Sequence, residues 1–171
     1  MCFTFYKAKG YTIGNSLCED EFVAEAKSLV DNEKVYLPAD IVVAKEVKTG
    51  IAGTTVAADK IPADMIGVDI GSRSISEIKK LISQAKTIVW NGPMGIFEID
   101  EFARGTVDVA KAVADATERG AISVVGGGDS VAALEKFDLA EKISHVSTGG
   151  GASLEFLEGL ELPGVKVLKD R

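Results

Sequence analysis

The chain has 171 residues, 46% of them hydrophobic and 26% charged, which is the composition of an ordinary globular domain with a sizeable core. Its net charge of −7 opposes sequence-independent binding to nucleic acids or anionic membranes. No apolar run approaches the roughly 18 residues of a membrane helix, and the N-terminus lacks a signal pattern. We therefore expect no nucleic-acid partner and no membrane association.

The cysteine and histidine content is low. Cys2 and Cys18 have no CxxC spacing, and His145 is the only histidine. A structural zinc site is not supported, and two free thiols in a reducing cytosol are expected.

The first half of the chain shows two capping-box spacings, each followed by apolar residues at helical intervals. The first is Ser16 with Glu19, and the second is Ser74 with Glu77. The elements predicted for this half are helices over 22–30 and 78–85 and strands over Lys34–Leu37 and Asp40–Lys45.

The second half alternates apolar strands with amphipathic helices. Thr87–Trp90 is a continuous apolar run, which is typical of a parallel strand covered on both faces. His145 falls inside a predicted strand, where a packed, hydrogen-bonded core residue is expected. The later elements predicted are helix Thr106–Thr117, strand Ala121–Val125, helix Val131–Phe137, strand His145–Thr148 and helix Ala152–Leu157. The alternation predicts parallel βαβ units and an α/β fold, whose ligands bind at the carboxyl ends of the strands.

The segment Gly126–Ser130 (GGGDS) follows such a strand end. Consecutive glycines let the backbone approach a ligand, and the helix that follows adds its positive end, so the segment is typical of a phosphate site. Asp129 can hold Mg²⁺ or cap the helix, and Ser130 can donate to a phosphate oxygen. The chain has neither a Walker A loop nor a GxGxxG pattern. The structural alternative is a tight strand–helix turn with Asp129 as N-cap.

Two more glycine segments follow predicted strands. Trp90–Glu98 combines glycines and a proline with Asn91 and Glu98, and a carboxylate such as Glu98 can accept both hydroxyls of a ribose. Ser147–Ser153 repeats the order of strand, glycines and helix start, so two corners from neighbouring strands can flank one ligand. The alternatives are a structural turn for the first and a flexible hinge for the second. Gly67–Gly71 is a weaker glycine-flanked segment.

In order and spacing, these segments resemble phosphoglycerate kinase over essentially the whole chain. The motifs WNGPMGIFE, GGGDS and SHVSTGGGASLEFLEG are specific to that family. The matching segments are Phe3-Thr4-Phe5, Ile13–Leu17, Leu37-Pro38, Gly67–Gly71, Val89–Glu98, Phe102–Thr106, Val125–Ser130, Ser144–Gly159 and Leu162–Val165.

The resemblance implies a Rossmann-like parallel three-layer sandwich that is incomplete, with residues 1–171 forming part of the C-terminal nucleotide-binding domain. It implies a cytoplasmic, monomeric parent enzyme of glycolysis that transfers a phosphoryl group between 1,3-bisphosphoglycerate and ADP, giving 3-phosphoglycerate and ATP, with Mg²⁺. The implied site residues are Gly67 and Val68 against adenosine; Asn91 and Pro93 in the nucleotide site; Glu98 on the ribose; Gly127, Gly128, Asp129 and Ser130 at the phosphates, with Asp129 near the metal; and Gly149 and Gly150 facing the transferred group.

The family's phosphoglycerate-binding N-terminal domain and its catalytic lysines are expected to lie outside this chain, so the chain alone is expected to be inactive. Ser72 replaces a usual proline and Ala44-Lys45 a usual Ala-Asp, with local effects on shape expected. A parallel sheet that lacks its middle strand is expected to expose edges and apolar surface. The alternatives are a non-catalytic nucleotide-binding module and a dinucleotide-dependent oxidoreductase; the missing GxGxxG opposes the second.

Overall fold

The computed structural model describes residues 1–147 and 149–168, which form an α/β structure. The chain divides into two compact units. Unit 1 contains Met1–Leu81 and Met94–Val109, and unit 2 contains Ile82–Pro93 and Ala110–Arg171. The end of the predicted strand His145–Thr148 lies outside the described residues.

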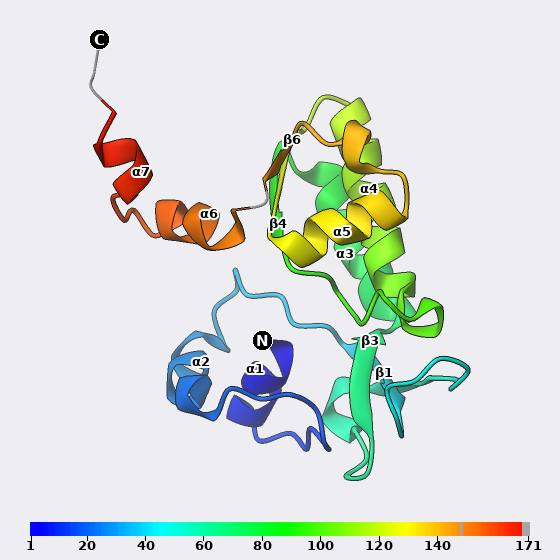
Figure 1. The fold of residues 1–171 in the computed structure, drawn as a ribbon. Helices are drawn as coiled ribbons and strands as arrows, with labels where there is room; N and C mark the ends of the chain where they lie inside the picture. Colours follow the sequence, from blue (N-terminus) through cyan, green and yellow to red (C-terminus); the bar gives the residue numbers. More distant parts are fainter. Residues whose placement is uncertain (148, 169–171) are drawn as a thin grey trace. The chain divides into compact units, whose positions relative to one another are not determined.

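Unit 1 is built around an antiparallel sheet, whose described strands have the order β2-β1-β3 (Figure 1). Between β1 and β3 the register shifts, so Val43 pairs with Gly67 and Val42 with Asp69, which leaves Val68 as the additional residue of a bulge. The elements are α1 (Cys2–Ala8), η1 (Asp20–Phe22), α2 (Val23–Leu29), β1 (Asp40–Ala44), β2 (Thr54–Ala57), η2 (Ala58–Lys60), β3 (Ile66–Ile70), most of α3 (Ser72–Gln84), η3 (Asp100–Phe102) and the start of α4 (Arg104–Glu118).

A hydrophobic cluster supports the β3 side of this sheet. Ala44, Val68 and Phe102 are buried, and Ile96 and Ile99 pack against them. The cluster therefore joins the strands to the segment that precedes α4, and burial of these side chains contributes to its stability.

Several predictions for the first half are wrong. Residues 34–37 form no strand in the described structure, and β2 and β3 were not predicted. Ser16 does not cap a helix; its hydroxyl accepts a hydrogen bond from the Gly67 N–H at 2.9 Å. These errors come from tertiary contacts that outweigh local pattern, since the chain pairs β1 with strands that lie on either side of it in space.

The cap of α3 also comes from elsewhere in the chain. The helix begins at Ser72, so Ser74 lies inside it and is not its N-cap. The carboxylate of Asp40, in β1, accepts the N–H groups of Arg73 at 3.1 Å and Ser74 at 2.8 Å. The buried Ser74 hydroxyl in turn accepts the N–H groups of Ala39 and Asp40. A side chain distant in sequence thus satisfies the first turn of the helix.

Unit 2 holds the parallel sheet that the sequence predicts. Its described strands have the order β4-β5-β6, and α5 packs against β5 and β6 (Figure 1). The elements are β4 (Thr87–Asn91), β5 (Ile122–Gly126), α5 (Gly128–Lys136), η4 (Ala140–Lys142), β6 (His145–Ser147), α6 (Gly150–Leu157) and α7 (Pro163–Lys166), with the ends of α3 and α4. The α/β class is confirmed.

The two faces of this sheet differ in burial. Trp90 and Val125 pair across β4 and β5 and are buried, whereas Val89 is 48% exposed and pairs with the partly buried Val124. Because side chains alternate along a strand, one face is covered and the other is open in the described structure. The prediction that Thr87–Trp90 is covered on both faces is therefore wrong. His145 pairs with Val124 and is exposed, which corrects its predicted place in the core.

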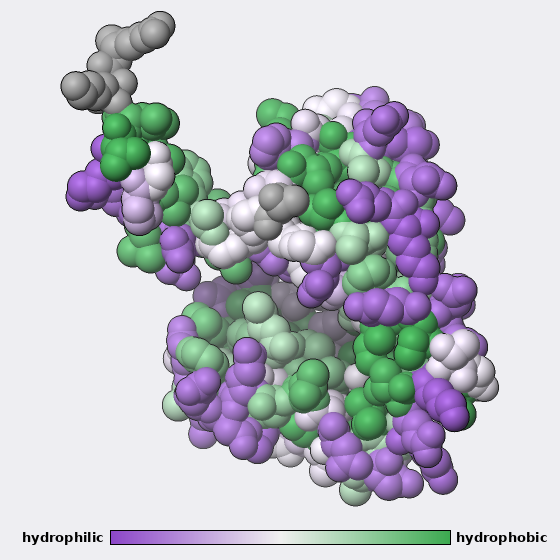
Figure 2. All heavy atoms as spheres, in the orientation of Figure 1, coloured by the Kyte–Doolittle hydropathy of each residue, from purple (hydrophilic) through white to green (hydrophobic). Residues whose placement is uncertain are grey.

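Large apolar side chains are also exposed along the last two helices and beside them in the chain (Figure 2). They are Leu154, Phe156, Leu157, Leu160, Val165, Val167 and Leu168. None of the helices in the described part of the chain combines the length and apolar character needed to cross a membrane.

Candidate functional site

The β5–α5 corner has the geometry of an anion site. Gly127 has φ +93° and is the N-cap of α5, so the helix begins at Gly128. Positive φ is readily adopted by glycine, which explains its presence here. The N–H groups of the first helical turn have no acceptor within the helix and carry the positive end of its dipole. Asp129 is the second helical residue and is exposed, which excludes the alternative in which Asp129 is the N-cap.

Ser130 connects this corner to the end of β4. Its side chain is fully buried, and its Oγ accepts the Gly92 N–H at 2.7 Å. Gly92 has φ +90°, and its carbonyl accepts the indole N–H of Trp90 at 2.6 Å. The Ser130 hydroxyl therefore holds the turn after β4, and the expected donation from this hydroxyl to a phosphate stays a prediction.

The second glycine corner lies against the first. The Gly127 N–H donates to the Ser147 carbonyl at 3.2 Å, and the Asn91 Nδ2 donates to the Gly150 carbonyl at 3.2 Å. A Cβ on Gly150 would lie 2.7 Å from the Cα of Gly127, closer than side chains pack. The ends of β4, β5 and β6 thus converge, and the two corners lie side by side as the sequence predicts.

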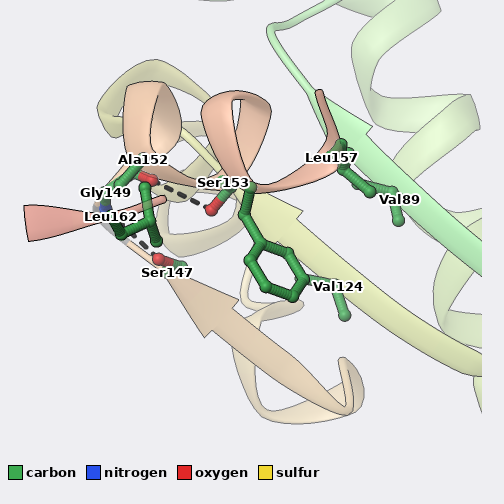
Figure 3. A pocket seen from close by; sticks show the side chains of 9 residues that line it. Val89, Val124, Ser147, Gly149, Ala152, Ser153, Leu157 and Leu162 are labelled. Carbon is green, nitrogen blue, oxygen red and sulfur yellow. Dashed lines mark hydrogen bonds between the residues drawn. The ribbon is translucent and has the colours of Figure 1, made fainter. Parts of the chain in front are cut away.

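An apolar pocket of about 460 Å³ adjoins the second corner on the open face of the sheet (Figure 3). Gly149 lines the pocket together with Ser147 and Ser153. The Gly149 N–H donates to the Ser147 Oγ at 3.2 Å, and the Gly149 carbonyl accepts the Ser153 hydroxyl at 2.9 Å. The remaining lining residues are Val89, Val124, Ala152, Phe156, Leu157 and Leu162. Hydroxyl groups therefore fix the loop, and the pocket itself is mainly apolar.

Gly67 and Val68 lie in unit 1, on β3. The ring of Phe3 occupies the space that a Cβ on Gly67 would need. Val68 is 2% exposed and belongs to the hydrophobic cluster, and its carbonyl accepts the Ile96 N–H at 2.9 Å. Their expected contact with adenosine stays a prediction, and the side chain of Val68 is engaged in packing.

The segment that carries Glu98 also lies in unit 1. Thr106, fully buried in α4, accepts the N–H groups of Met94 at 3.1 Å and Gly95 at 3.3 Å through its Oγ1. Glu98 is exposed, and Pro93, the last residue of unit 2 before this segment, is half-buried. Unit 2 thus brings together Asn91 and the two glycine corners, while Gly67, Val68 and Glu98 belong to unit 1.

The sequence reasoning missed one site-like group, the buried carboxylate of Asp69. Asp69 is 5% exposed, and its two oxygens accept the N–H groups of Ile70 at 2.8 Å and Gly105 at 2.7 Å. Its carboxylate also fills the space that a Cβ on Gly95 or Gly105 would need. The signal in the sequence was an aspartate within a glycine-flanked apolar strand.

Burial raises the pKa of the Asp69 carboxyl to about 6, because the charged form loses water. The N–H groups of Gly105 and Ile70 lower this pKa, since they stabilise the anion. The negative charge of Asp108 raises it and the positive charge of Arg104 lowers it.

Metal-binding groups are sparse. Among residues 1–147 and 149–168 no three histidine, cysteine, aspartate or glutamate side chains gather as a metal site would need. Asp129 is a single exposed carboxylate beside the glycine corner. Because Mg²⁺ usually keeps several waters and binds through one or two carboxylates together with substrate phosphates, this arrangement fits Mg²⁺ carried by a nucleotide.

The sequence matches the model of a known protein family. A family model described as phosphoglycerate kinase matches residues 1–160. The chain belongs to the phosphoglycerate kinase family. The phosphoglycerate kinase of Rubrobacter xylanophilus is 54% identical over 173 residues, covering 100% of this chain and 43% of that protein. That of Chlorobaculum tepidum is 53% identical over 99% of this chain and 44% of its own length.

Solved structures of the family agree with the fold. Phosphoglycerate kinase from Coxiella burnetii matches with a TM-score of 0.88 and 45% identity, over 96% of this chain and 43% of its own. The enzyme from Pyrococcus horikoshii matches with a TM-score of 0.79 and 32% identity, over 96% of this chain and 42% of its own. The incomplete Rossmann-like α/β fold is thereby confirmed, and the chain spans less than half the length of these phosphoglycerate kinases.

Proposed function

We propose that this chain carries the MgADP/MgATP-binding part of a phosphoglycerate kinase, with residues 1–171 as part of the C-terminal nucleotide-binding domain. The parent enzyme would transfer a phosphoryl group between 1,3-bisphosphoglycerate and ADP, giving 3-phosphoglycerate and ATP, in the glycolysis of the cytoplasm. The observation that carries the proposal is the convergence of two glycine corners at the carboxyl ends of β5 and β6. Membership of the phosphoglycerate kinase family supports it.

Phosphate binding falls to backbone groups. The N–H groups of Gly128, Asp129 and Ser130 open α5, and Gly127 lets the chain turn sharply before them. Such amides, aligned with the helix dipole, neutralise phosphate charge without a basic side chain. This arrangement suits a chain of net charge −7.

The second corner serves the transferred group. Gly149 is the N-cap of α6 and Gly150 its first residue, and Gly150 approaches the backbone of Gly127 because it has no side chain. Phosphoryl transfer requires mainly positioning and charge neutralisation, which backbone amides held in a fixed place supply. The hydrogen bond from Asn91 to Gly150 holds this corner beside the first.

Mg²⁺ would be held by Asp129 together with nucleotide phosphates, and when bound it would supply positive charge to the phosphoryl oxygens. Glu98 would accept the ribose hydroxyls, and Gly67, Val68, Asn91 and Pro93 would line the rest of the nucleotide site. The phosphoglycerate substrate would be bound by the remainder of a full-length enzyme. We therefore expect nucleotide binding but no turnover from the 171-residue chain.

Calorimetric titration tests the proposal. MgADP should give heat with this chain, and NAD should give none. Asp129→Asn should weaken binding of MgADP but leave binding of ADP in excess chelator unchanged, because only the metal needs the carboxylate. Asp115→Asn, at an exposed position of α4, is the matched control and should change neither. No heat with MgADP, or heat with NAD alone, would refute the proposal.

A coupled assay separates an enzyme from a non-catalytic module. The chain alone should show no turnover, and a full-length relative such as that of Rubrobacter xylanophilus provides the positive control. Activity of the chain alone would contradict the expectation.

A further inference from the structure

Two buried polar side chains converge on the segment that carries Glu98. Asp69 comes from β3 and Thr106 from the first turns of α4, and both lie in unit 1. Asp69 is 5% exposed and Thr106 is 0% exposed. Buried polar groups destabilise a fold unless they are hydrogen-bonded, so their partners indicate what they hold in place.

Asp69 holds the start of α4 beside the segment, and Gly95 packs against its carboxylate. One carboxylate oxygen accepts the Gly105 N–H at 2.7 Å, at the start of α4, and the other accepts the N–H of Ile70 at 2.8 Å. Because Gly105 and Gly95 have no side chain, the carboxylate can occupy the space where their Cβ atoms would lie. The carboxylate therefore lies between β3, the start of α4 and the turn at Gly95.

Thr106 fixes the start of the segment. Its Oγ1 accepts the Met94 N–H at 3.1 Å and the Gly95 N–H at 3.3 Å. The next residue, Ile96, donates its N–H to the Val68 carbonyl on β3 at 2.9 Å. Three successive N–H groups of the segment thus have acceptors on β3 or α4.

These contacts restrict the backbone of Glu98. Its neighbour Phe97 is 5% exposed, and Ile99 packs against the cluster of Ala44, Val68 and Phe102. The Glu98 side chain itself is exposed. An exposed carboxylate on a rigid segment suits ligand contact, because the buried contacts have already fixed its position.

We propose that Asp69 and Thr106 are positioning residues for Glu98, and that they set the affinity of this chain for the ribose hydroxyls of a nucleotide. The inference rests on the proposed function, since it assigns the ribose contact to Glu98. Asp69 and Thr106 would not touch the ligand; they would act on Glu98 through the backbone of residues 94–98.

Ribose dependence separates positioning from general stability. The ligands are MgADP and Mg-2′,3′-dideoxy-ADP, which lacks the hydroxyls that Glu98 would accept. Thr106→Val removes the acceptor at nearly constant volume and should weaken MgADP binding about fivefold, the effect of one lost hydrogen bond. Binding of the dideoxy nucleotide should not change. Thr106→Ser keeps the hydroxyl and should restore MgADP binding.

Asp69→Asn should behave like Thr106→Val, because its amide replaces one acceptor oxygen with a donor. In a Glu98→Gln background, Thr106→Val should bring no further loss of MgADP affinity. The control is Thr117→Val, a second α4 threonine whose hydroxyl bonds the Val113 carbonyl and Ser123 in unit 2. It should leave the ratio of the two affinities unchanged.

The outcomes distinguish the two levels of the proposal. Equal losses of affinity for both nucleotides, or additive losses in the Glu98→Gln background, would overturn the positioning inference. The proposed function would still stand in that case, provided that the unmodified chain binds MgADP. No binding of either nucleotide by the unmodified chain would overturn both. A selective loss for MgADP, absent in the Glu98→Gln background, supports the inference.

Discussion

The two units use glycine for different physical reasons. In unit 1, Gly95 and Gly105 make room for the buried carboxylate of Asp69. In unit 2, Gly150 makes room for the backbone of Gly127, which itself has positive φ. Glycine therefore makes room for a buried side chain in unit 1, whereas in unit 2 it lets two backbone segments approach each other at the glycine corners.

The difference extends to charge and exposure. Unit 1 buries an ionisable group inside a hydrogen-bonded clamp, whereas the glycine corner of unit 2 begins a helix with an exposed Asp129. The sheet of unit 2 leaves one described face open, with Val89 48% exposed. Glycine-rich segments thus differ in what they offer a ligand, and burial of the neighbouring carboxylate distinguishes the two kinds.

The largest effect is expected from a substitution that breaks the close contact between the two glycine corners of unit 2. Gly150→Ala should reduce the free energy of unfolding by about 3 kcal/mol, because its Cβ would lie 2.7 Å from the Cα of Gly127 and backbone does not yield easily. Urea titration followed by Trp90 fluorescence measures it.

The neighbouring Gly151→Ala is the matched control. A Cβ there has nothing within 4 Å, so alanine in α6 should be neutral or stabilising. Equal destabilisation by the two variants would show that the corners do not need their close approach.

The pH dependence of unit 1 gives the next effect. Burial raises the pKa of Asp69 to about 6, above the ordinary aspartate value of 3.8 that the unfolded chain approaches, so the folded state binds the proton more tightly. The contribution of Asp69 to stability therefore rises as the pH falls from 7.5 to 4.5, by about 2 kcal/mol. Urea unfolding across this range, followed by circular dichroism, should show this contribution.

The Asp69→Asn variant isolates that contribution, because asparagine does not titrate. Subtracting its pH profile from that of the unmodified chain removes the common effects of all other carboxyl groups. The charged neighbours Asp108 and Arg104 remain in both proteins. Parallel profiles would contradict a buried, titrating Asp69.

A smaller effect is expected at the join of β4 and α5. Ser130→Ala removes the acceptor of the Gly92 N–H in a fully buried place and should reduce stability by about 1 kcal/mol. Ser153→Ala, whose hydroxyl donates to the Gly149 carbonyl near the surface, should cost less. The reverse order would show that Ser130 does not hold the turn after β4.

The sequence predicted unit 2 better than unit 1, for a physical reason. In unit 2 the strands β4 and β5 and the helices between them follow local patterns, and each glycine segment stands at a strand end. The parallel order and the meeting of the two corners followed from these patterns. His145 was placed wrongly because burial of a strand face depends on what covers it, which periodicity does not reveal.

In unit 1 the determinants are remote in sequence. The cap of α3 comes from Asp40, more than thirty residues away, and Ser16 bonds Gly67 instead of capping a helix. The buried Asp69 was overlooked because its partners, Ile70 apart, follow it by more than twenty residues. Glu98 was a candidate ribose ligand from its own segment, whereas the contact of Gly67 and Val68 with adenosine came only from the family resemblance.

The most direct test of nucleotide binding is to observe the β5–α5 corner during titration. In ¹H–¹⁵N spectra of the chain, MgADP should shift the amide resonances of Gly128, Asp129 and Ser130 most, together with those of Gly149 and Gly150. The exposed amides of α7 should serve as an unperturbed reference. Saturable shifts at both corners are the predicted result. Shifts that avoid both corners, or no shifts at millimolar MgADP, would contradict the account.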